Sequence, residues 1–253
     1  MVGGNAAGER LTAQRRAVIL AGGLGTRLRP YTTVLPKPLM PIGDRPVLDV
    51  VVRQLHRSGF DRITIATGHL AELIEAFFGD GARFGVSIDY FRESRPLGTV
   101  GSLALIDDLD DDFLVMNGDV LTDIDYGALL EQHVRSDAVA TIAVARRSVQ
   151  ISLGVLHFSA DGDASRLAGY EEKPVLDYDA SMGVYCFSPS AVRHVEPGER
   201  LDFPELVQRL LATGEVVRGW RSDAYWLDIG RHEDYEQATE EFERMRSRLI
   251  PDE

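Results

Sequence analysis

Residues 16–39 read R-A-V-I-L-A-G-G-L-G-T-R-L-R-P-Y-T-T-V-L-P-K-P-L, and this stretch decides how the rest of the chain is interpreted. An apolar, β-branched run over residues 17–21 is followed at once by three glycines within residues 22–25, and then by Thr26 and Arg27. Glycine tolerates positive φ and lets backbone N–H groups approach a ligand closely, while arginine stays charged near neutral pH. The pattern predicts a buried strand that ends in a loop suited to a triphosphate.

Two well-known phosphate loops do not fit this stretch. The P-loop requires G-x-x-x-x-G-K-[ST], and no Gly-Lys-[ST] follows the glycines. The dinucleotide fingerprint requires G-x-G-x-x-G, but Leu28 stands where its third glycine would be. For the G-G-x-G pattern alone, an ordinary strand-to-loop turn is an equally good interpretation.

The longer string is more specific. A-G-G-L-G-T-R-L-R-P, followed by P-K-P-L-M-P-I, resembles the signature of the sugar-1-phosphate nucleotidylyltransferases, with the mannose- or heptose-type guanylyltransferase branch closest in look. The resemblance covers roughly residues 16 to 240. It implies that the glycine loop wraps a nucleoside triphosphate and that Arg27 and Lys37 contact its phosphates. Lys37 lies between two prolines, whose fixed φ reduces the entropy lost when the lysine is held on a phosphate.

Composition sets the class of protein. The chain has 253 residues, of which 44% are hydrophobic, enough for one large α/β domain with its own core. Cys186 is its only cysteine, so no intramolecular disulfide is possible, and apolar neighbours favour a buried thiol over a nucleophile. These features predict a protein of the reducing cytoplasm.

Charge and apolar runs argue against two kinds of partner. The formal net charge is −13, and an acidic surface repels a nucleic-acid backbone, although a small phosphorylated ligand needs only a few local cations. Residues 1–14 lack the apolar core of a signal peptide, and we expect a disordered lead there. Later apolar runs are too short to cross a bilayer, so we expect no membrane partner. The sequence leaves open whether the chain forms a homo-oligomer.

Strands and helices alternate along the first half of the chain. Asp44 is expected to cap a helix that begins near Pro46 and stops at Gly59. Short connections between such units imply parallel strands and a doubly wound, mostly parallel, Rossmann-like α/β sheet. The expected order is a strand over 63–66, a helix over 70–78, a strand over 86–91, and a single domain over 15–250 with a nucleotide-binding half (15–135) and a strand-rich sugar-phosphate-binding half (136–250).

Ligands of such sheets bind beyond the carboxyl ends of the strands, so the loops after residues 21, 91 and 116 should converge. The segment P-L-G-T-V-G over 96–101 resembles the family's second nucleotide-binding segment, although a turn before a helix over 99–106 would need the same residues. The nucleotide-binding residues implied by the resemblance are Leu20, Ala21, Gly22, Gly23, Gly25, Thr26, Arg27, Glu93, Pro96, Gly98 and Thr99.

Two carboxylates are the candidate metal ligands. An apolar strand over 113–119 ends in Asp119, which such a placement exposes at the crevice. Mg²⁺ prefers one or two carboxylates, with phosphate oxygens and waters completing its shell. Y-W-L-D-I-G over 225–230 matches the family's second metal-binding segment and implies Asp228 as the other ligand. Singly, Asp119 could instead be a loop cap. Together with Arg27 and Lys37, Asp119 is implied to be catalytic.

The second half should bind the acceptor. Strands are expected over 138–145, 153–158, 167–172 and 182–187, and helices over 203–211 and 235–249. E-K-P over 172–174 resembles a family motif in which Glu172 would hold sugar hydroxyls and Lys173 the sugar phosphate, with Gly154 and Gly183 beside the sugar. Ser181-Met182-Gly183 departs from the commoner asparagine-containing version, so the sugar stays open. No hexapeptide repeat follows, and we expect no left-handed β-helix.

The implied reaction joins a nucleoside triphosphate and a sugar 1-phosphate, or a sugar-like cyclitol phosphate, to give a nucleotide sugar and pyrophosphate with Mg²⁺. Glu93 favours GTP, because an ionised carboxylate accepts from the two adjacent donors of guanine. It could equally pair with Arg92 or Arg95 on the surface. The alternatives are a dTTP- or UTP-using glucose-1-phosphate-type transferase, a transferase for a phosphorylated amine or polyol, and a catalytically silent, nucleotide-binding regulatory subunit.

Overall fold

The computed structural model describes residues 15–159 and 165–251, so the predicted lead over residues 1–14 lies outside the described residues. Its strands are β1 (Arg15–Ala21), β2 (Pro41–Ile42), β3 (Arg45–Pro46), β4 (Phe60–Thr67), β5 (Ser87–Arg92), β6 (Phe113–Asn117), β7 (Val120–Thr122), β8 (Ala140–Gln150), β9 (Gly154–Phe158), β10 (Leu167–Glu172), β11 (Val175–Phe187), β12 (Val217–Ser222) and β13 (Trp226–Asp228). Its α-helices are α2 (Val47–Arg57), α3 (Ala71–Phe78), α4 (Tyr126–Val134), α5 (Pro189–Val192), α6 (Phe203–Ala212) and α7 (His232–Leu249).

A seven-stranded sheet forms the centre of the described part of the chain, in the order β12-β8-β11-β6-β1-β4-β5. Strands β1, β4, β5 and β6 pair in parallel, as do β8 and β12, whereas β11 is antiparallel to both of its neighbours. This arrangement confirms the predicted doubly wound, mostly parallel α/β fold. The two predicted halves share this one sheet, and no β-helix occurs among the described residues.

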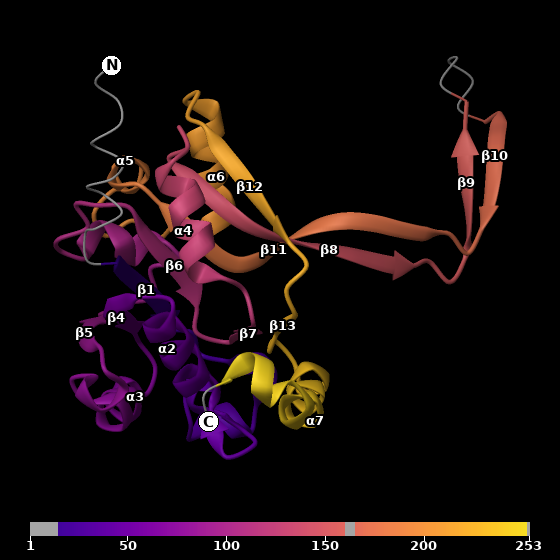
Figure 1. The fold of residues 1–253 in the computed structure, drawn as a ribbon. Helices are drawn as coiled ribbons and strands as arrows, with labels where there is room; N and C mark the ends of the chain where they lie inside the picture. Colours follow the sequence, from indigo (N-terminus) through magenta and orange to yellow (C-terminus); the bar gives the residue numbers. More distant parts are fainter. Residues whose placement is uncertain (1–14, 160–164, 252–253) are drawn as a thin grey trace.

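Helices cover both faces of the sheet because its strands are apolar on both sides (Figure 1). Alternate residues of β1 point to opposite faces. Ala17 and Ile19 join a core formed with α2, α3 and α4, whereas Val18 joins a core formed with α5 and α6. The β-branched run that opens the chain therefore lies at the centre of the fold. Cys186 is fully buried in the first core, as predicted, and burial raises the pKa of its thiol well above the ordinary value.

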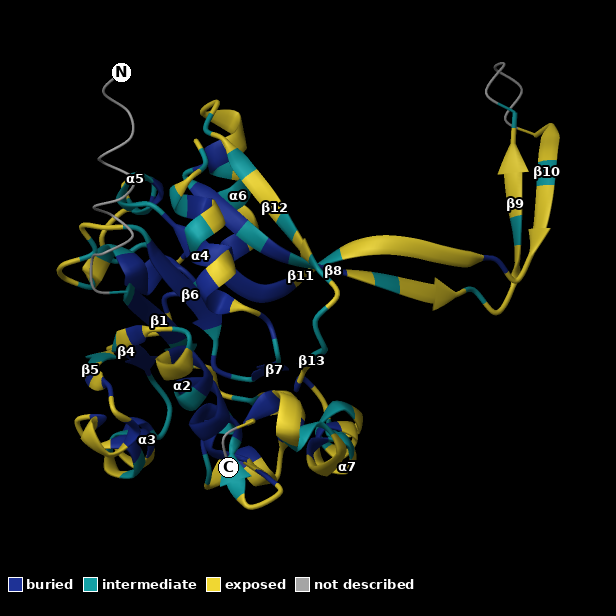
Figure 2. Ribbon diagram, viewed as in Figure 1, coloured by how far each residue is buried: buried dark blue, intermediate teal, exposed yellow. Residues whose placement is uncertain are grey.

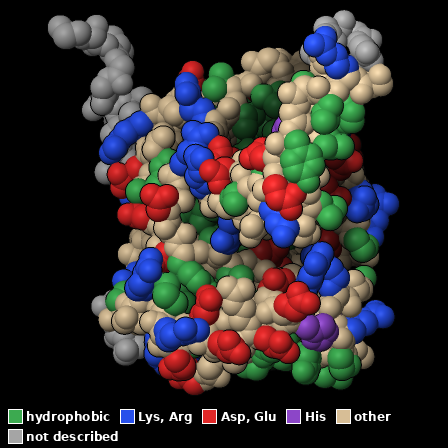
Figure 3. Space-filling view, turned by 90° about the vertical axis from the view of Figure 1, so that its right-hand side faces the viewer, with side chains coloured by type: hydrophobic (Ala, Val, Ile, Leu, Met, Phe, Trp, Pro, Cys, Tyr) green, Lys and Arg blue, Asp and Glu red, His purple; other side chains and the backbone are tan. Residues whose placement is uncertain are grey.

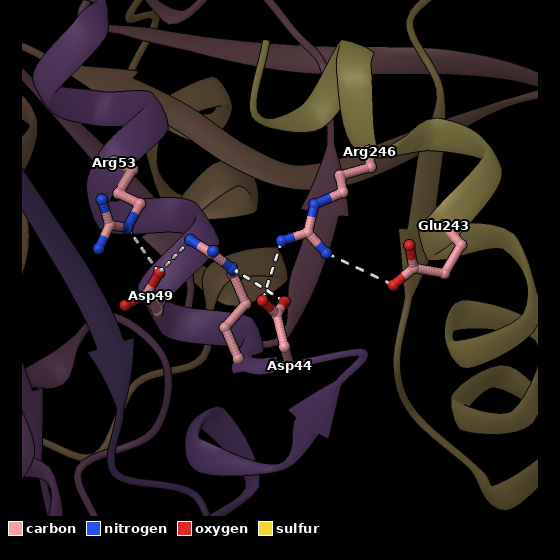
Figure 4. Close-up of polar contacts among 6 residues, drawn as sticks. Asp44, Asp49, Arg53, Glu243 and Arg246 are labelled. Atoms are coloured by element: carbon pink, nitrogen blue, oxygen red, sulfur yellow. Dashed lines mark hydrogen bonds and ion pairs between the residues drawn. The ribbon is translucent and has the colours of Figure 1, made fainter. Parts of the chain in front are cut away.

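The predicted cap of the first helix is wrong. Pro46 is the N-cap of α2, and Asp44 accepts hydrogen bonds instead from Arg246 of α7 (2.9 Å) and from Arg45 (3.4 Å) (Figure 4). The bond from Arg246 is the largest cause of a lowered Asp44 pKa. Within the helix, Asp49 accepts from Arg53 at 2.7 Å. An arginine 202 residues further along the chain thus replaces the local capping interaction that the sequence favours.

The predicted helix over 99–106 is also shorter than expected. Only residues 101–105 form a 3₁₀ helix, η5 (Gly101–Leu105). The preceding backbone pairs across the molecule, since Val100 N donates to Leu201 O (3.1 Å) and Leu201 N donates to Leu97 O (2.9 Å). These bonds hold residues 97–100 in extended and turn conformations, so that a full α-helix does not start at Thr99.

Strands β8 and β11 are longer than predicted and run well beyond the body of the protein (Figure 1). Their outer parts lead to the two-stranded β9–β10 hairpin, which pairs with no other strand of the described residues. We call residues 146–159 and 165–181 the arm. No helix of the described residues is long and apolar enough to cross a membrane.

Candidate active site

A cavity of about 380 Å³ lies at the carboxyl ends of β1 and β6. Every residue predicted to bind the nucleotide lines it, together with the predicted catalytic residues Lys37 and Asp119. The loop after β1 contributes Gly22, Gly23 and Gly25 to its lining, at the carboxyl end of a parallel strand, where ligands of such sheets bind. The three loops expected to converge on one crevice do converge.

The glycine loop is shaped by close backbone contacts. Gly25 has φ +58°, and a Cβ on it would lie 2.8 Å from Cγ2 of Thr32. The Thr32 hydroxyl in turn donates to the Gly25 carbonyl at 2.8 Å. On the other side of the loop, Gly68 packs against Gly22, where a Cβ would lie 2.6 Å from the Gly22 carbonyl oxygen. Side chains at these positions would push the loop away from its neighbours, so the glycines set the shape of the cavity.

A short ladder brings the two predicted metal ligands together. Strand β13 pairs antiparallel with β7, with Asp228 opposite Val120. Directly beyond this pair, the Ile229 amide donates to the Asp119 carbonyl at 3.1 Å. The ladder therefore places Asp228 beside Asp119, although only Asp119 is among the residues that line the cavity.

The charges at this edge are only partly balanced. Lys37 Nζ contacts Oδ2 of Asp119, whose Oδ1 is buried and has no hydrogen-bond partner. Asp228 is exposed to solvent, although neighbouring groups remove part of the hydration of its carboxylate. This desolvation, and then the negative charge of Asp119, raise the pKa of Asp228, against the opposing effect of Lys37 and Arg27. Two adjacent acids with an unused oxygen suit a divalent cation.

Carboxylates alone do not complete a metal shell here. The described residues contain no group of three or more His, Cys, Asp and Glu side chains that could hold a metal ion. Mg²⁺ commonly binds through one or two carboxylates and takes its remaining ligands from substrate phosphates and water. The pair Asp119 and Asp228 fits that type of site.

Glu93 also lines the cavity. Its carboxylate accepts from the Leu97 amide at 3.3 Å and lies next to Gly22, where a Cβ would be 3.4 Å from the carboxyl carbon of Glu93. Burial raises its pKa, and the bond from Leu97 partly offsets that effect. The neighbouring arginines have other partners: Arg92 binds Glu72 and Glu75, and Arg95 donates to the Gly198 carbonyl. The surface pairing of Glu93 with either arginine therefore does not occur.

The backbone at Gly98 is held against the start of α6. Gly98 has φ +79°, and a Cβ there would lie 2.5 Å from the Leu201 carbonyl oxygen. Next to it, the Thr99 amide donates to Asp202 at 3.0 Å, and the Phe203 amide donates to the Thr99 hydroxyl at 2.6 Å. These contacts fix one wall of the cavity.

Comparison with known proteins identifies the family. Residues 16–245 match the family model described as nucleotidyl transferase. The chain belongs to this nucleotidyl transferase family. It is 31% identical to the D-glycero-α-D-manno-heptose 1-phosphate guanylyltransferase of Aneurinibacillus thermoaerophilus, covering 90% of this chain and 98% of that one. The suspected branch is consistent with this relative and with mannose-1-phosphate guanylyltransferases of the same family.

The relatives within the nucleotidyl transferase family include longer proteins and a uridylyltransferase. The UTP–glucose-1-phosphate uridylyltransferase of Synechocystis is 35% identical over 88% of this chain, but the match covers 62% of that relative. The chain thus spans less than two thirds of several curated relatives it matches. Among solved structures, HddC from Yersinia pseudotuberculosis aligns with a TM-score of 0.68 at 28% identity, over 90% of this chain and 99% of HddC.

The four predicted sugar-phosphate residues do not lie together. Gly183 lies beside the cavity, where a Cβ would be 2.8 Å from the side-chain nitrogen Nδ2 of Asn117. Gly154, Glu172 and Lys173 lie on the arm, and none of them lines the cavity of its own chain. Gly154, Glu172 and Gly183 lie in strands, as predicted, and Lys173 lies in the bend between β10 and β11. The direction of the arm separates Gly154, Glu172 and Lys173 from the cavity.

Four residues that line the cavity are not among the predicted site residues. They are Pro38, Asn117, Asp202 and Gly230. Asn117 ends the same strand that leads to Asp119, so its position at the carboxyl end of β6 is a usable signal. Asp202 carries the signature of a helix start, since it forms a capping box with Glu205, and nothing in the sequence separates that structural role from a place in the cavity.

Proposed function

We propose that this protein transfers the nucleotidyl group of a nucleoside triphosphate, GTP in preference, to a sugar 1-phosphate or a sugar-like cyclitol phosphate. The supporting observation is the cavity itself, which is lined by the glycine loop, by Arg27 and Lys37 and by Asp119. Asp228 lies near enough to this group for the charges of Asp119, Lys37 and Arg27 to affect its pKa. The family relationship supports the same class of reaction. We further propose a cytoplasmic location, in line with the single buried thiol.

In the proposed reaction, an oxygen of the sugar phosphate attacks the α-phosphorus of the triphosphate. A new P–O bond forms, and the bond from the α-phosphorus to the bridging oxygen breaks as pyrophosphate leaves. The attacking phosphate is already ionised, so no general base is required. Arg27 and Lys37 neutralise phosphate charge, and the backbone N–H groups of the glycine loop hold the triphosphate in place. The side chains thus act by positioning and by charge, without a covalent enzyme intermediate.

Asp119 and Asp228 would hold Mg²⁺, which neutralises phosphate charge when it is bound. The buried, unpartnered Oδ1 of Asp119 supports this assignment, because an acceptor without a donor is costly unless a cation uses it. Oδ2 of the same carboxylate contacts Lys37, so the two oxygens of Asp119 would serve a cation and an ammonium group. The carboxylate therefore also orients Lys37 toward the phosphates.

Glu93 is the proposed reader of the base. Its position in the cavity, without an arginine partner, leaves an acceptor for the N1–H and N2 amino group of guanine, while uracil and thymine flank their one donor with carbonyl oxygens. Relatives use different bases, since they include guanylyl, uridylyl and thymidylyl transferases. A solved HddC structure contains GMP-PN.

The test compares GTP, dTTP, UTP and ATP at equal concentration with a panel of sugar 1-phosphates, following pyrophosphate release. We expect the highest kcat/KM with GTP, and we expect Glu93→Gln to lower the GTP:UTP ratio by about tenfold, the effect of weakening one charge-assisted pair of hydrogen bonds. A preference for dTTP or UTP would favour the glucose-1-phosphate-type alternative. Nucleotide binding without transfer to any acceptor would instead favour a regulatory subunit.

A further inference from the structure

The arm exposes an unusual amount of apolar surface. Of the sixteen large hydrophobic side chains that are exposed among the described residues, nine lie on the arm, at 47–71% exposure. They are Val149, Leu153, Leu156, Phe158, Leu167, Tyr170, Val175, Leu176 and Tyr178. Figure 2 shows the arm almost entirely exposed, and Figure 3, which views the side from which the arm projects, shows hydrophobic side chains gathered at its upper right. Exposed apolar surface concentrated on one segment in this way indicates an interaction surface.

One face of the β9–β10 hairpin combines this apolar surface with the predicted sugar-binding residues. Leu156 pairs across the ladder with Tyr170, and Gly154 pairs with Glu172, so these side chains share a face. The Tyr170 hydroxyl donates to Glu172 at 2.6 Å. Lys173 follows with φ +48°, a strained conformation for a non-glycine residue that is most often found at functional sites.

The β9–β10 hairpin has no third strand beside it among the described residues. Two strands alone are marginally stable in water and require a third strand or a covering surface. In the described part of the chain, β9 and β10 pair only with each other. The outer end of β8 is likewise an open edge, since β12 pairs with it only as far as Ala145. Open edges and exposed apolar faces together call for a partner.

The arm is held away from its own cavity. Strand β8 is continuous over eleven residues, a rigid length of about 35 Å at 3.3 Å per residue. Ion pairs brace its ladder with β11 and β12, from Arg146 to Asp177 (2.9 Å) and from Arg221 to Asp179 (2.6 Å). At the base, the Arg147 guanidinium stacks on Trp226 with its carbon 4.6 Å from the ring centroid. Folding the arm back would break these contacts.

We propose that the arm docks on a second copy of this chain and completes that copy's active site with Glu172, Lys173 and Gly154. Each copy has one cavity that lacks these residues and one arm that carries them. If each arm docks on the other copy, the result is a symmetric dimer in which both arms and both cavities are used. The role given to Glu172 and Lys173 rests on the proposed function, whereas the pairing of copies rests on the arm's apolar face and open edges.

Complementation of two inactive variants tests the shared site. Asp228→Asn damages the cavity and Lys173→Ala damages the arm, so each alone is expected to have little activity when the sugar phosphate is kept well below the wild-type KM. After the copies exchange, one of the two sites in a mixed dimer joins an intact cavity to an intact arm, and an equal mixture should recover about a quarter of the wild-type rate. The matched control mixes Asp228→Asn with Asp119→Asn, which both damage the cavity and should recover nothing. Recovery no greater than the sum of the two variants would overturn the proposal.

Light scattering tests the pairing without any assay of activity. The intact chain is expected at the mass of a dimer, and Phe158→Asp on the arm should shift it to the mass of a monomer and lower the rate by about tenfold or more. Leu211→Asp, on an exposed apolar residue of α6, is the control and should leave the dimer intact. A monomeric wild-type protein would refute the proposal. A dimer that transfers no nucleotidyl group would refute the proposed function and leave the arm's pairing supported.

Discussion

Replacing Gly98 by alanine tests whether the backbone before η5 and the start of α6 are held at a fixed separation within one wall of the cavity. Two costs are expected. The φ of +79° is left-handed, which costs an alanine about 1–2 kcal/mol. The new Cβ would also lie 2.5 Å from the Leu201 carbonyl oxygen and 2.8 Å from the Asp202 carboxylate, so the two segments must separate. Overpacking of this kind adds about 1–3 kcal/mol.

Gly214→Ala supplies the matched control. Gly214 has almost the same φ, +81°, but a Cβ there meets nothing within 4 Å, so only the conformational cost applies. At about 3 °C per kcal/mol for a chain of this size, the Tm of Gly98→Ala should fall about 3–9 °C below that of Gly214→Ala. Since Thr99 and Asp202 move with the wall, KM for the triphosphate should rise about tenfold in Gly98→Ala only. Equal Tm values for the two variants would show that the wall yields freely, and the reasoning would fail.

We expect Asp119→Asn and Asp228→Asn each to lower kcat by about a hundredfold or more and to weaken Mg²⁺ binding. The control Asp111→Asn, in the exposed acidic run, should change neither quantity. If Asp119→Asn or Asp228→Asn kept a near-normal rate at modest Mg²⁺, the replaced acid would not belong to the site. Without metal, the raised pKa of Asp228 means that its protonated form favours the fold, so this stability is complete below the ordinary value of 3.8 and is lost as pH rises through the folded pKa. The Tm of metal-free Asp228→Asn should therefore exceed that of the wild type increasingly toward neutral pH, and the opposite trend in a pH series would contradict the pKa shift. Arg27→Ala should lower kcat with the triphosphate, whereas Lys173→Ala should raise KM for the sugar phosphate; initial rates with each substrate varied in turn separate the two, and an unchanged acceptor KM at normal kcat would exclude Lys173.

The sequence predicts most of the nucleotide side of the site because that side depends on local signals. An apolar strand followed by glycines, and a strand that ends at Asp119, specify both the sheet and the edge where its loops meet. The motif over 225–230 predicts Asp228 as the second acid, and the β13–β7 ladder places it next to Asp119. Each of these features is encoded within a few consecutive residues.

What the sequence does not predict depends on contacts between distant segments. Asp44 binds Arg246 and does not cap α2, and the backbone before η5 is hydrogen-bonded to Leu201. The direction of the arm is a similar case. Strand periodicity predicts β9 and β10, but their placement depends on how β11 leaves the sheet at the register shift between Ser181 and Tyr185, where two additional residues interrupt the ladder with β8. No local pattern encodes that path.

Trp226 lies at the base of the arm, where its fluorescence can report on the arm. Its indole N–H donates to the Met182 carbonyl at 2.8 Å, beside the irregular part of β11, and its ring lies under Arg147 at the base of the arm. Two residues later, the same short strand carries Asp228. The chain has one other tryptophan, Trp220 on β12. The fluorescence of a Trp220→Phe protein would therefore come from a single indole that contacts the arm and lies near Asp228, the proposed metal ligand. One emission signal would then report both the docking of the arm and the binding of metal.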